Sequence, residues 1–184
     1  HHRLYEYINN NRDVYTSNLL SFLSFSTYFT AIQERQLADS EPTLPAWING
    51  WLPALDSIAL YSFIAINKPK IYMEVGSGNS TKFARQAISD HHLDTKIVSI
   101  DPYPRAEIDR ICDEVIRQPV EEIDLRIFDR LESNDILFID NSHRTFMNSD
   151  ATTIFIDVIP ALKPGVLVEI HDIMLPYDYP SAWI

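Results

Sequence analysis

The first stretch whose residue types suit chemistry is a short turn that contains two glycines. It reads Glu74-Val75-Gly76-Ser77-Gly78-Asn79-Ser80-Thr81. The glycines allow the backbone to turn tightly and to approach a ligand closely, and Asn79, Ser80 or Thr81 can cap a helix that begins there. A group bound at this turn would lie against bare backbone amides. The sequence therefore predicts a ligand-binding turn at residues 74–81.

An acidic residue, Asp101, follows this turn about 20 residues later, directly after the apolar run Lys96–Ile100. In nucleotide-binding α/β folds an acid at this position accepts hydrogen bonds from both hydroxyls of a ribose. The alternative is that Asp101 only caps a loop or helix before Pro102. Because strand, glycine turn and acid occur in the order that nucleotide binding requires, we favour the ribose role.

A second group of polar side chains follows two further apolar runs. Asp140 and His143 follow the first run, and His171 and Asp172 end the second. Carboxylates and imidazoles serve as general bases and as ligands of divalent metals. Glu169 also lies in the second run, but we leave it out because the strand is ending there. The group predicts proton transfer or metal binding, if the fold brings the two runs together.

The elements that must position these residues begin near Lys70, where short β-rich runs alternate with helical stretches. This alternation is typical of βαβ units and a parallel sheet. The expected strands are 71–75, 96–100, 114–117, 135–139 and 165–170, and the expected helices are 54–66, 80–89, 120–131 and 150–162. We therefore predict an α/β fold with a doubly wound, mainly parallel, Rossmann-like sheet.

The chain before this sheet has a different character. Its first forty or so residues are expected to be helical, and residues 40–53 contain three prolines and a glycine that are typical of a linker. We expect residues 1–50 to form a helical extension that covers the site or makes a homodimer surface, and residues 51–184 to form the main domain. The aromatic and aliphatic residues of the extension that support this are Tyr15, Leu19, Leu20, Phe22, Leu23, Phe25 and Phe29.

Composition excludes several classes of protein. With 15 Lys and Arg against 26 Asp and Glu, the net charge of −11 would repel a phosphate backbone, so we expect no nucleic-acid partner. The single cysteine, Cys112, permits no internal disulfide and favours the cytoplasm. The apolar stretch Val14–Ile32 is interrupted by Asn18 and several hydroxyl residues, so we expect a buried helix there and no membrane contact.

The motifs together resemble those of class I S-adenosylmethionine-dependent methyltransferases, over roughly residues 61–180. The residues that carry the resemblance are Glu74-Val75-Gly76-Ser77-Gly78, Asp101, Phe138-Ile139-Asp140 and Leu162-Lys163-Pro164-Gly165. Within that family, Asp140-Asn141-Ser142-His143 looks closest to the small-molecule methyltransferases related to macrocin O-methyltransferase and cephalosporin hydroxylase. The family fold usually ends with a helix and an antiparallel strand pair, which we expect to be absent from the residues up to Ile184.

The resemblance implies S-adenosylmethionine as the cofactor and a small molecule, methylated at a hydroxyl, as the acceptor. It implies that Glu74 and the Gly76–Gly78 turn hold the methionine part, while Asp101 holds the ribose as the residues themselves indicate. The expected cofactor-binding residues are Glu74, Gly76, Ser77, Gly78, Asn79, Ser80, Asp101 and Asp140.

In the strand order that the family implies, the strands before Asp140 and His171 are neighbours, about 4.8 Å apart. Asp140, His171 and Asp172 are then expected to share one divalent cation such as Mg²⁺, which would position a substrate hydroxyl and lower its pKa. The alternative is that Asp140 contacts the cofactor or caps the next segment and that no metal binds.

A hydroxyl acceptor must lose its proton, which requires a base. His143 is the first candidate, because it lies just past Asp140 and has an ordinary pKa near neutrality, and His171 is the second. The alternative for His143 is a hydrogen bond to a loop.

Two other functions are considered. A nicotinamide-dependent oxidoreductase would need a third glycine where Thr81 stands, and the Tyr-x-x-x-Lys pair of one such family is missing, since Tyr177 is followed at that spacing by Ser181. The other alternative is a non-catalytic nucleotide-binding module. Titration with the candidate cofactors distinguishes all three.

Overall fold

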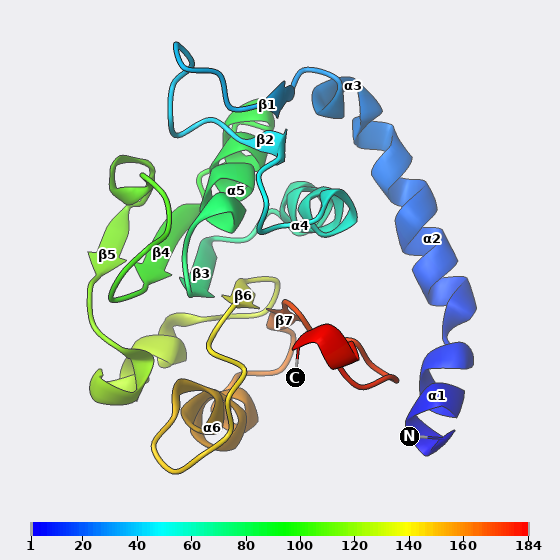
Figure 1. The fold of residues 1–184 in the computed structure, drawn as a ribbon, viewed down its shortest axis with the longest axis vertical. Helices are drawn as coiled ribbons and strands as arrows, with labels where there is room; N and C mark the ends of the chain where they lie inside the picture. The colour runs from blue at the N-terminus through cyan, green and yellow to red at the C-terminus, as the bar shows by residue number, and fades with distance from the viewer. Residues whose placement is uncertain (1, 184) are drawn as a thin grey trace.

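A five-stranded parallel sheet lies at the centre of residues 2–183, the part of the chain that the computed structural model describes (Figure 1). In spatial order its strands are β5 (Glu114–Ile116), β4 (Lys96–Ile100), β3 (Ile71–Val75), β6 (Ile136–Ile139) and β7 (Leu167–Ile170). All neighbouring strands are parallel. The predicted α/β fold with a parallel sheet is therefore confirmed. His1 and Ile184, the outermost residues of the two expected parts, lie outside the described residues.

Both faces of the sheet are covered, which explains why its strands are almost continuously apolar. Side chains such as Tyr72 pack on one face beneath α4 (Ala54–Asn67) and α5 (Asn79–Asp90). Side chains such as Met73 face the opposite core, which the segments after β5 and β6 cover. Since β3 connects to β4 on one side while β6 connects to β7 on the other, the carboxyl ends of β3 and β6 form the switch point where α/β sheets bind ligands.

The cover of the second face departs from the expected regular helices. A single helix over 120–131 is wrong: two 3₁₀ turns, η3 (Val120–Glu122) and η4 (Leu125–Arg130), are separated by an extended Ile123. The Asp124 side chain accepts a hydrogen bond from the Arg126 amide, 3.1 Å away, and so starts the second turn. Residues 150–161 are helical as predicted, but change from α6 (Asp150–Thr153) to a π-helical turn, η5 (Ile154–Val158), and then to a 3₁₀ turn, η6 (Ile159–Ala161).

The amino-terminal helices run along one side of the molecule (Figure 1). Their inner face packs on α4, where the rings of Phe22 and Phe63 lie 5.2 Å apart and those of Phe29 and Tyr61 also 5.2 Å apart. The expectation of a buried helix is thus only half right, since the outer face is exposed. These elements are α1 (His2–Asn9), α2 (Arg12–Phe22), η1 (Leu23–Phe25) and α3 (Ser26–Phe29), and the exposed apolar side chains include Val14, Leu19, Leu20 and Leu23. Within residues 2–183, the helices are too short or too polar to span a bilayer.

The segment expected as a linker is partly structured. β1 (Gln33–Arg35) and β2 (Ala46–Ile48) pair in parallel. Ala46 is buried, and the Trp47 ring packs 5.4 Å from that of Phe83 on α5. The linker prediction is therefore wrong for its second half, because apolar side chains there join the core of the main domain.

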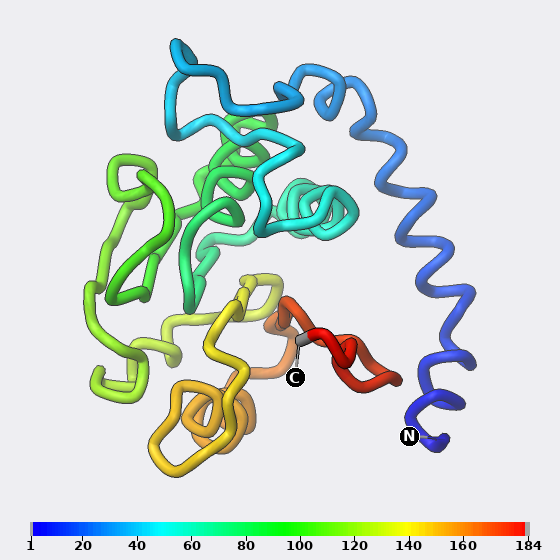
Figure 2. The backbone as a smooth tube through the Cα atoms, viewed as in Figure 1, coloured from blue at the N-terminus to red at the C-terminus, as the bar shows by residue number. Residues whose placement is uncertain are grey.

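Beyond β7 the described residues form turns and a final 3₁₀ turn, η7 (Ser181–Trp183), with no further strand up to residue 183. The smooth trace in Figure 2 shows this carboxyl-terminal segment running toward α1. Pro176 and Tyr177 share a shallow groove there with residues of α1 and α2 such as Tyr5 and Tyr15.

Candidate functional site

The glycine turn is built at the end of β3, against the end of β6. Gly76 has φ +84° and donates a backbone hydrogen bond to the Ile100 carbonyl at 3.0 Å. A Cβ atom at this position would lie 1.9 Å from the backbone carbonyl oxygen of Asp140. Glycine is therefore required here both by backbone conformation and by space.

Asp101 is fixed to this turn through its side chain. One carboxylate oxygen accepts a hydrogen bond from the Ser77 amide at 2.7 Å, and the other accepts from the Tyr103 amide at 2.7 Å. Each carboxylate oxygen has further lone pairs with which to accept hydrogen bonds from a ligand. The structure thus presents Asp101 in one orientation, beside the amides of the turn.

Glu74, at the start of the motif, is enclosed by hydroxyl groups. Its side chain is fully buried and accepts hydrogen bonds from the hydroxyls of Tyr72 at 2.9 Å and Ser80 at 3.1 Å, and also from Thr81. Glu74 does not line the pocket described below. In this structure its carboxylate supports the first turn of α5, and direct contact with the cofactor stays a prediction.

This burial predicts a pH-dependent stability. Burial raises the pKa of Glu74 from 4.5 to about 7, although the hydroxyl donors oppose the shift. The folded state therefore holds this proton more tightly than the unfolded state, so its contribution to stability is complete below about pH 4.5 and is lost as the pH rises through about 7. At about 1.4 kcal/mol per pKa unit, the loss amounts to about 3 kcal/mol.

We expect Glu74→Gln to remove this component from the pH dependence of the free energy of unfolding. The measurement is urea denaturation of both proteins between about pH 4 and pH 8, followed as the difference between them. A variant whose stability runs parallel to that of the parent over this range would show that Glu74 titrates normally.

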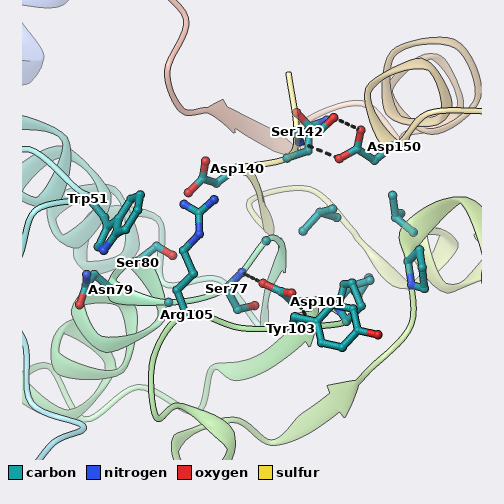
Figure 3. Close-up of a pocket in the computed structure, with 18 of the residues that line it drawn as sticks. Trp51, Ser77, Asn79, Ser80, Asp101, Tyr103, Arg105, Asp140, Ser142 and Asp150 are labelled. Atoms are coloured by element: carbon teal, nitrogen blue, oxygen red, sulfur yellow. Dashed lines mark hydrogen bonds between the residues drawn. The ribbon is translucent and has the colours of Figure 1, made fainter. Parts of the chain in front are cut away.

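A cavity of about 350 Å³ lies at the carboxyl ends of β3, β4 and β6 (Figure 3). Every expected cofactor-binding residue except Glu74 lines it, namely Gly76, Ser77, Gly78, Asn79, Ser80, Asp101 and Asp140. The opposite wall includes Trp51 and Leu52, from the loop before α4. An Asn79 side-chain hydrogen bond to Asn49, at 3.3 Å, joins this wall to the start of α5.

Trp51 and Leu52 could not be predicted as pocket residues, because nothing in a proline-rich stretch indicates that it folds over a turn that follows it in the chain. Both residues follow the expected boundary at residue 50 directly, so they lie at the start of the expected main domain, 51–184.

Beside Asp140 lies the expected acidic cluster. His171 Nδ1 is 3.5 Å from one carboxylate oxygen each of Asp140 and Asp172, and His171 Nε2 is 3.5 Å from a carboxylate oxygen of Asp56. One potential ligand atom from each of Asp140, His171 and Asp172 lies within 4.8 Å of the other two. The fold thus brings together the three predicted metal ligands. It adds Asp56 from α4, which carries no signal in the sequence.

Several polar atoms around this cluster are buried without a hydrogen-bond partner among the described residues. They are Nδ1 and Nε2 of His171, Nε2 of His143, Oε1 of Glu169 and Nδ2 of Asn141. Buried polar atoms are normally paired, and such a concentration indicates a place for a ligand or an ion. Carboxylates with an imidazole form a donor set that suits a divalent cation.

The charges in the cluster depend on one another. Burial alone would lower the pKa of His171, but Asp140, Asp56 and Asp172 raise it to about 10. Burial would raise the pKa of Asp140, but His143 and His171 hold it well below its ordinary value. Without a metal His171 is therefore an imidazolium at neutral pH, and it must lose that proton before it can act as a base or a ligand.

His143, the first candidate base, lies at φ +57° with Nε2 3.5 Å from an Asp140 carboxylate oxygen. Neither His143 nor His171 lines the cavity. Each histidine has a ring nitrogen 3.5 Å from an Asp140 carboxylate oxygen, and Asp140 itself lines the cavity. Through these contacts both histidines hold the pKa of Asp140 below its ordinary value.

Comparison with known proteins agrees with this architecture. A protein of Archaeoglobus fulgidus described only as uncharacterized is 35% identical over 94 residues, which are 48% of this chain and 42% of that protein. The chain thus matches less than half of the length of that relative, and no solved structure matches. A family model described as a methyltransferase domain matches residues 73–173, more than half of the chain, from the glycine turn to the end of the acidic cluster. This chain belongs to the methyltransferase domain family.

Proposed function

We propose that this protein is an S-adenosylmethionine-dependent methyltransferase that acts on a hydroxyl of a small molecule. The observation that supports it best is the double hydrogen bonding of Asp101, which presents a carboxylate beside the bare amides of the Gly76–Gly78 turn. S-adenosylmethionine carries a methyl group on a sulfonium. The acceptor attacks this methyl group in line and displaces the sulfur. The protein must mainly hold and orient the reactants.

The residues of the pocket suit the parts of such a cofactor. Asp101 can accept from the two ribose hydroxyls, and next to it Ile100, Pro102 and Val120 offer an apolar surface for a base ring. The methionine part then extends along the turn toward Asn79 and Ser80. This assignment places the reacting sulfur on the side of Asp140.

The test is calorimetric titration of the parent protein with S-adenosylmethionine, S-adenosylhomocysteine and NAD. Micromolar binding of the two sulfur compounds without binding of NAD is the expected result. Binding of NAD alone would support the oxidoreductase and overturn the proposal. Binding of the cofactor without turnover in an acceptor screen, with or without Mg²⁺, would favour a non-catalytic module.

The same proposal includes the metal and the base. Asp140, His171 and Asp172 would hold a divalent cation such as Mg²⁺, whose chemistry is to orient the acceptor hydroxyl and lower its pKa. His143 is the candidate to receive the hydroxyl proton, with His171 second. The buried nitrogens and oxygens that lack a hydrogen bond support the metal, while the contact of His143 Nε2 with Asp140 equally suits a histidine that only positions this acid.

Replacing a metal ligand is expected to weaken metal binding without unfolding the protein. Asp172→Ala should lower the affinity for Mn²⁺ by at least about tenfold, since it removes one of three protein ligands. Free Mn²⁺ can be counted by its electron paramagnetic resonance signal. Asp129→Ala, an exposed acid outside the cluster, is the matched control. Equal Mn²⁺ affinities of the two variants would exclude the predicted metal site.

The proposal also covers family, location and partners. We propose that the protein is related to the macrocin O-methyltransferase group, that it is cytoplasmic, and that it has no nucleic-acid or membrane partner. We also propose that its two parts divide at residue 50. A homodimer formed through the exposed face of α2, with Leu19 and Leu20, also belongs to the proposal. A monomeric mass in solution would contradict the dimer.

A further inference from the structure

One cationic side chain faces an otherwise acidic pocket. Among the described residues that line the cavity, Arg105 is the only Lys or Arg, and it lies in the loop after β4. The acidic lining residues are Asp101, Glu121, Asp140 and Asp150. The sulfonium of the proposed cofactor is itself a cation and does not need a cationic side chain beside it. The presence of Arg105 in this lining therefore needs an explanation.

Arg105 is held by an aromatic ring. Its guanidinium carbon lies 4.4 Å from the centre of the Trp51 ring, a cation–π contact across the mouth of the pocket. Figure 3 shows the guanidinium between Trp51 and Asp140, pointing over the turn that carries Ser80. Trp51 is 61% exposed, so the pair is at the surface and the contact does not serve core packing.

Within residues 2–183 the structure records no ion pair between the Arg105 guanidinium and an acidic side chain. Other arginines of the same region are paired: Arg85 with Asp113 at 2.6 Å and Arg117 with Asp109 at 2.5 Å. A guanidinium stacked by its face on indole keeps its N–H edges available. Those edges match a carboxylate through two parallel hydrogen bonds.

The position of Arg105 selects which part of a ligand it meets. In Figure 3 the glycine turn leads from Asp101 past Ser80 and Asn79 toward Trp51. If the ribose lies at Asp101, the amino-acid part of the same molecule extends toward Trp51. We propose that Arg105, stacked on Trp51, binds the α-carboxylate of the methionine part of the cofactor. This inference rests on the proposed function.

The test compares two ligands of which only one has the amino-acid part that carries this carboxylate. S-adenosylhomocysteine has the adenosine, the sulfur and the amino acid, whereas 5′-methylthioadenosine has the adenosine and the sulfur only. Calorimetric titration of the parent, Arg105→Gln and Arg105→Lys with both ligands is expected to show a loss of about tenfold or more for S-adenosylhomocysteine in Arg105→Gln. Arg105→Lys, which keeps the charge without the planar fork, should lose less. The affinity for 5′-methylthioadenosine should change by less than about twofold in both variants.

The matched control is Arg126→Gln, which removes an equal charge from an exposed arginine outside the pocket that pairs with Asp124. It should leave both affinities unchanged. If Arg105→Gln lowers the affinity for both ligands equally, or for neither, the proposed role of Arg105 is overturned. The side chain would then only shape the loop or neutralise Asp140. A parent protein that binds neither ligand would instead overturn the proposed function.

Discussion

Gly76→Ala is expected to destabilise the folded protein by at least about 4 kcal/mol, a loss that few single substitutions reach. The added Cβ would lie 1.9 Å from the carbonyl oxygen of Asp140, and that carbonyl belongs to backbone that cannot move freely, because the Asp140 amide donates to the Val75 carbonyl at 2.8 Å. To relieve the contact, β3 and β6 would have to separate at their carboxyl ends. The pocket would be lost together with the stability.

Gly50→Ala is the matched control, because Gly50 has nearly the same backbone conformation, φ +80°, but has no atom within 4 Å of an added Cβ. It should therefore show the conformational cost alone, about 1–2 kcal/mol. Denaturant unfolding of the parent and of both variants measures the difference. Equal losses in the two variants would show that the end of the sheet yields and that close approach at Gly76 is not decisive.

Asp101→Ala is expected to weaken binding of S-adenosylhomocysteine by about 100-fold or more. The substitution removes the carboxylate that accepts from the ribose hydroxyls, and a hydrogen bond to a charged group is worth about 1.5–3 kcal/mol. It also releases the amides of Ser77 and Tyr103, which Asp101 holds in place. Asp101→Asn retains one carbonyl oxygen, so its affinity for S-adenosylhomocysteine should lie between those of Asp101→Ala and the parent.

Titration calorimetry measures these affinities, and Glu121→Gln is the control, since Glu121 is another acid of the cavity lining for which residues 2–183 show no hydrogen bond to the glycine turn. The thermal unfolding midpoint of each variant should be recorded as well, to separate lost binding from lost folding. A folded Asp101→Ala protein that binds the ligand as tightly as the parent would exclude the ribose role and with it the orientation proposed for the cofactor.

The burial of Glu74 bears on the role of the first motif. An acid at the end of a strand before a glycine turn suggests direct contact with a ligand, but here the hydroxyls of Tyr72, Ser80 and Thr81 enclose it. Its effect on the cofactor would pass through α5, whose first residues, Asn79 and Ser80, face the pocket. In this structure the Glu74 carboxylate thus holds the hydroxyls of Ser80 and Thr81 at the start of α5.

The sequence by itself determined the sheet and the core of the site. Strands such as Ile136–Ile139 could be predicted because burial on both faces demands a continuous apolar run, which is a local pattern. The glycine turn and Asp101 could be predicted for the same kind of reason, since each follows its own strand directly. Parallel strands then bring their carboxyl ends to one edge, so Asp140 and His171 had to converge once the strand order was known.

Only the tertiary structure decided what completes the site. Asp56 beside His171, and Trp51 beneath Arg105, come from segments far away in the chain, and their approach depends on how α4 and its preceding loop pack on the sheet. Periodicity and motif spacing report the local demands of burial and backbone conformation, whereas these contacts arise from packing between distant segments, which no local pattern records.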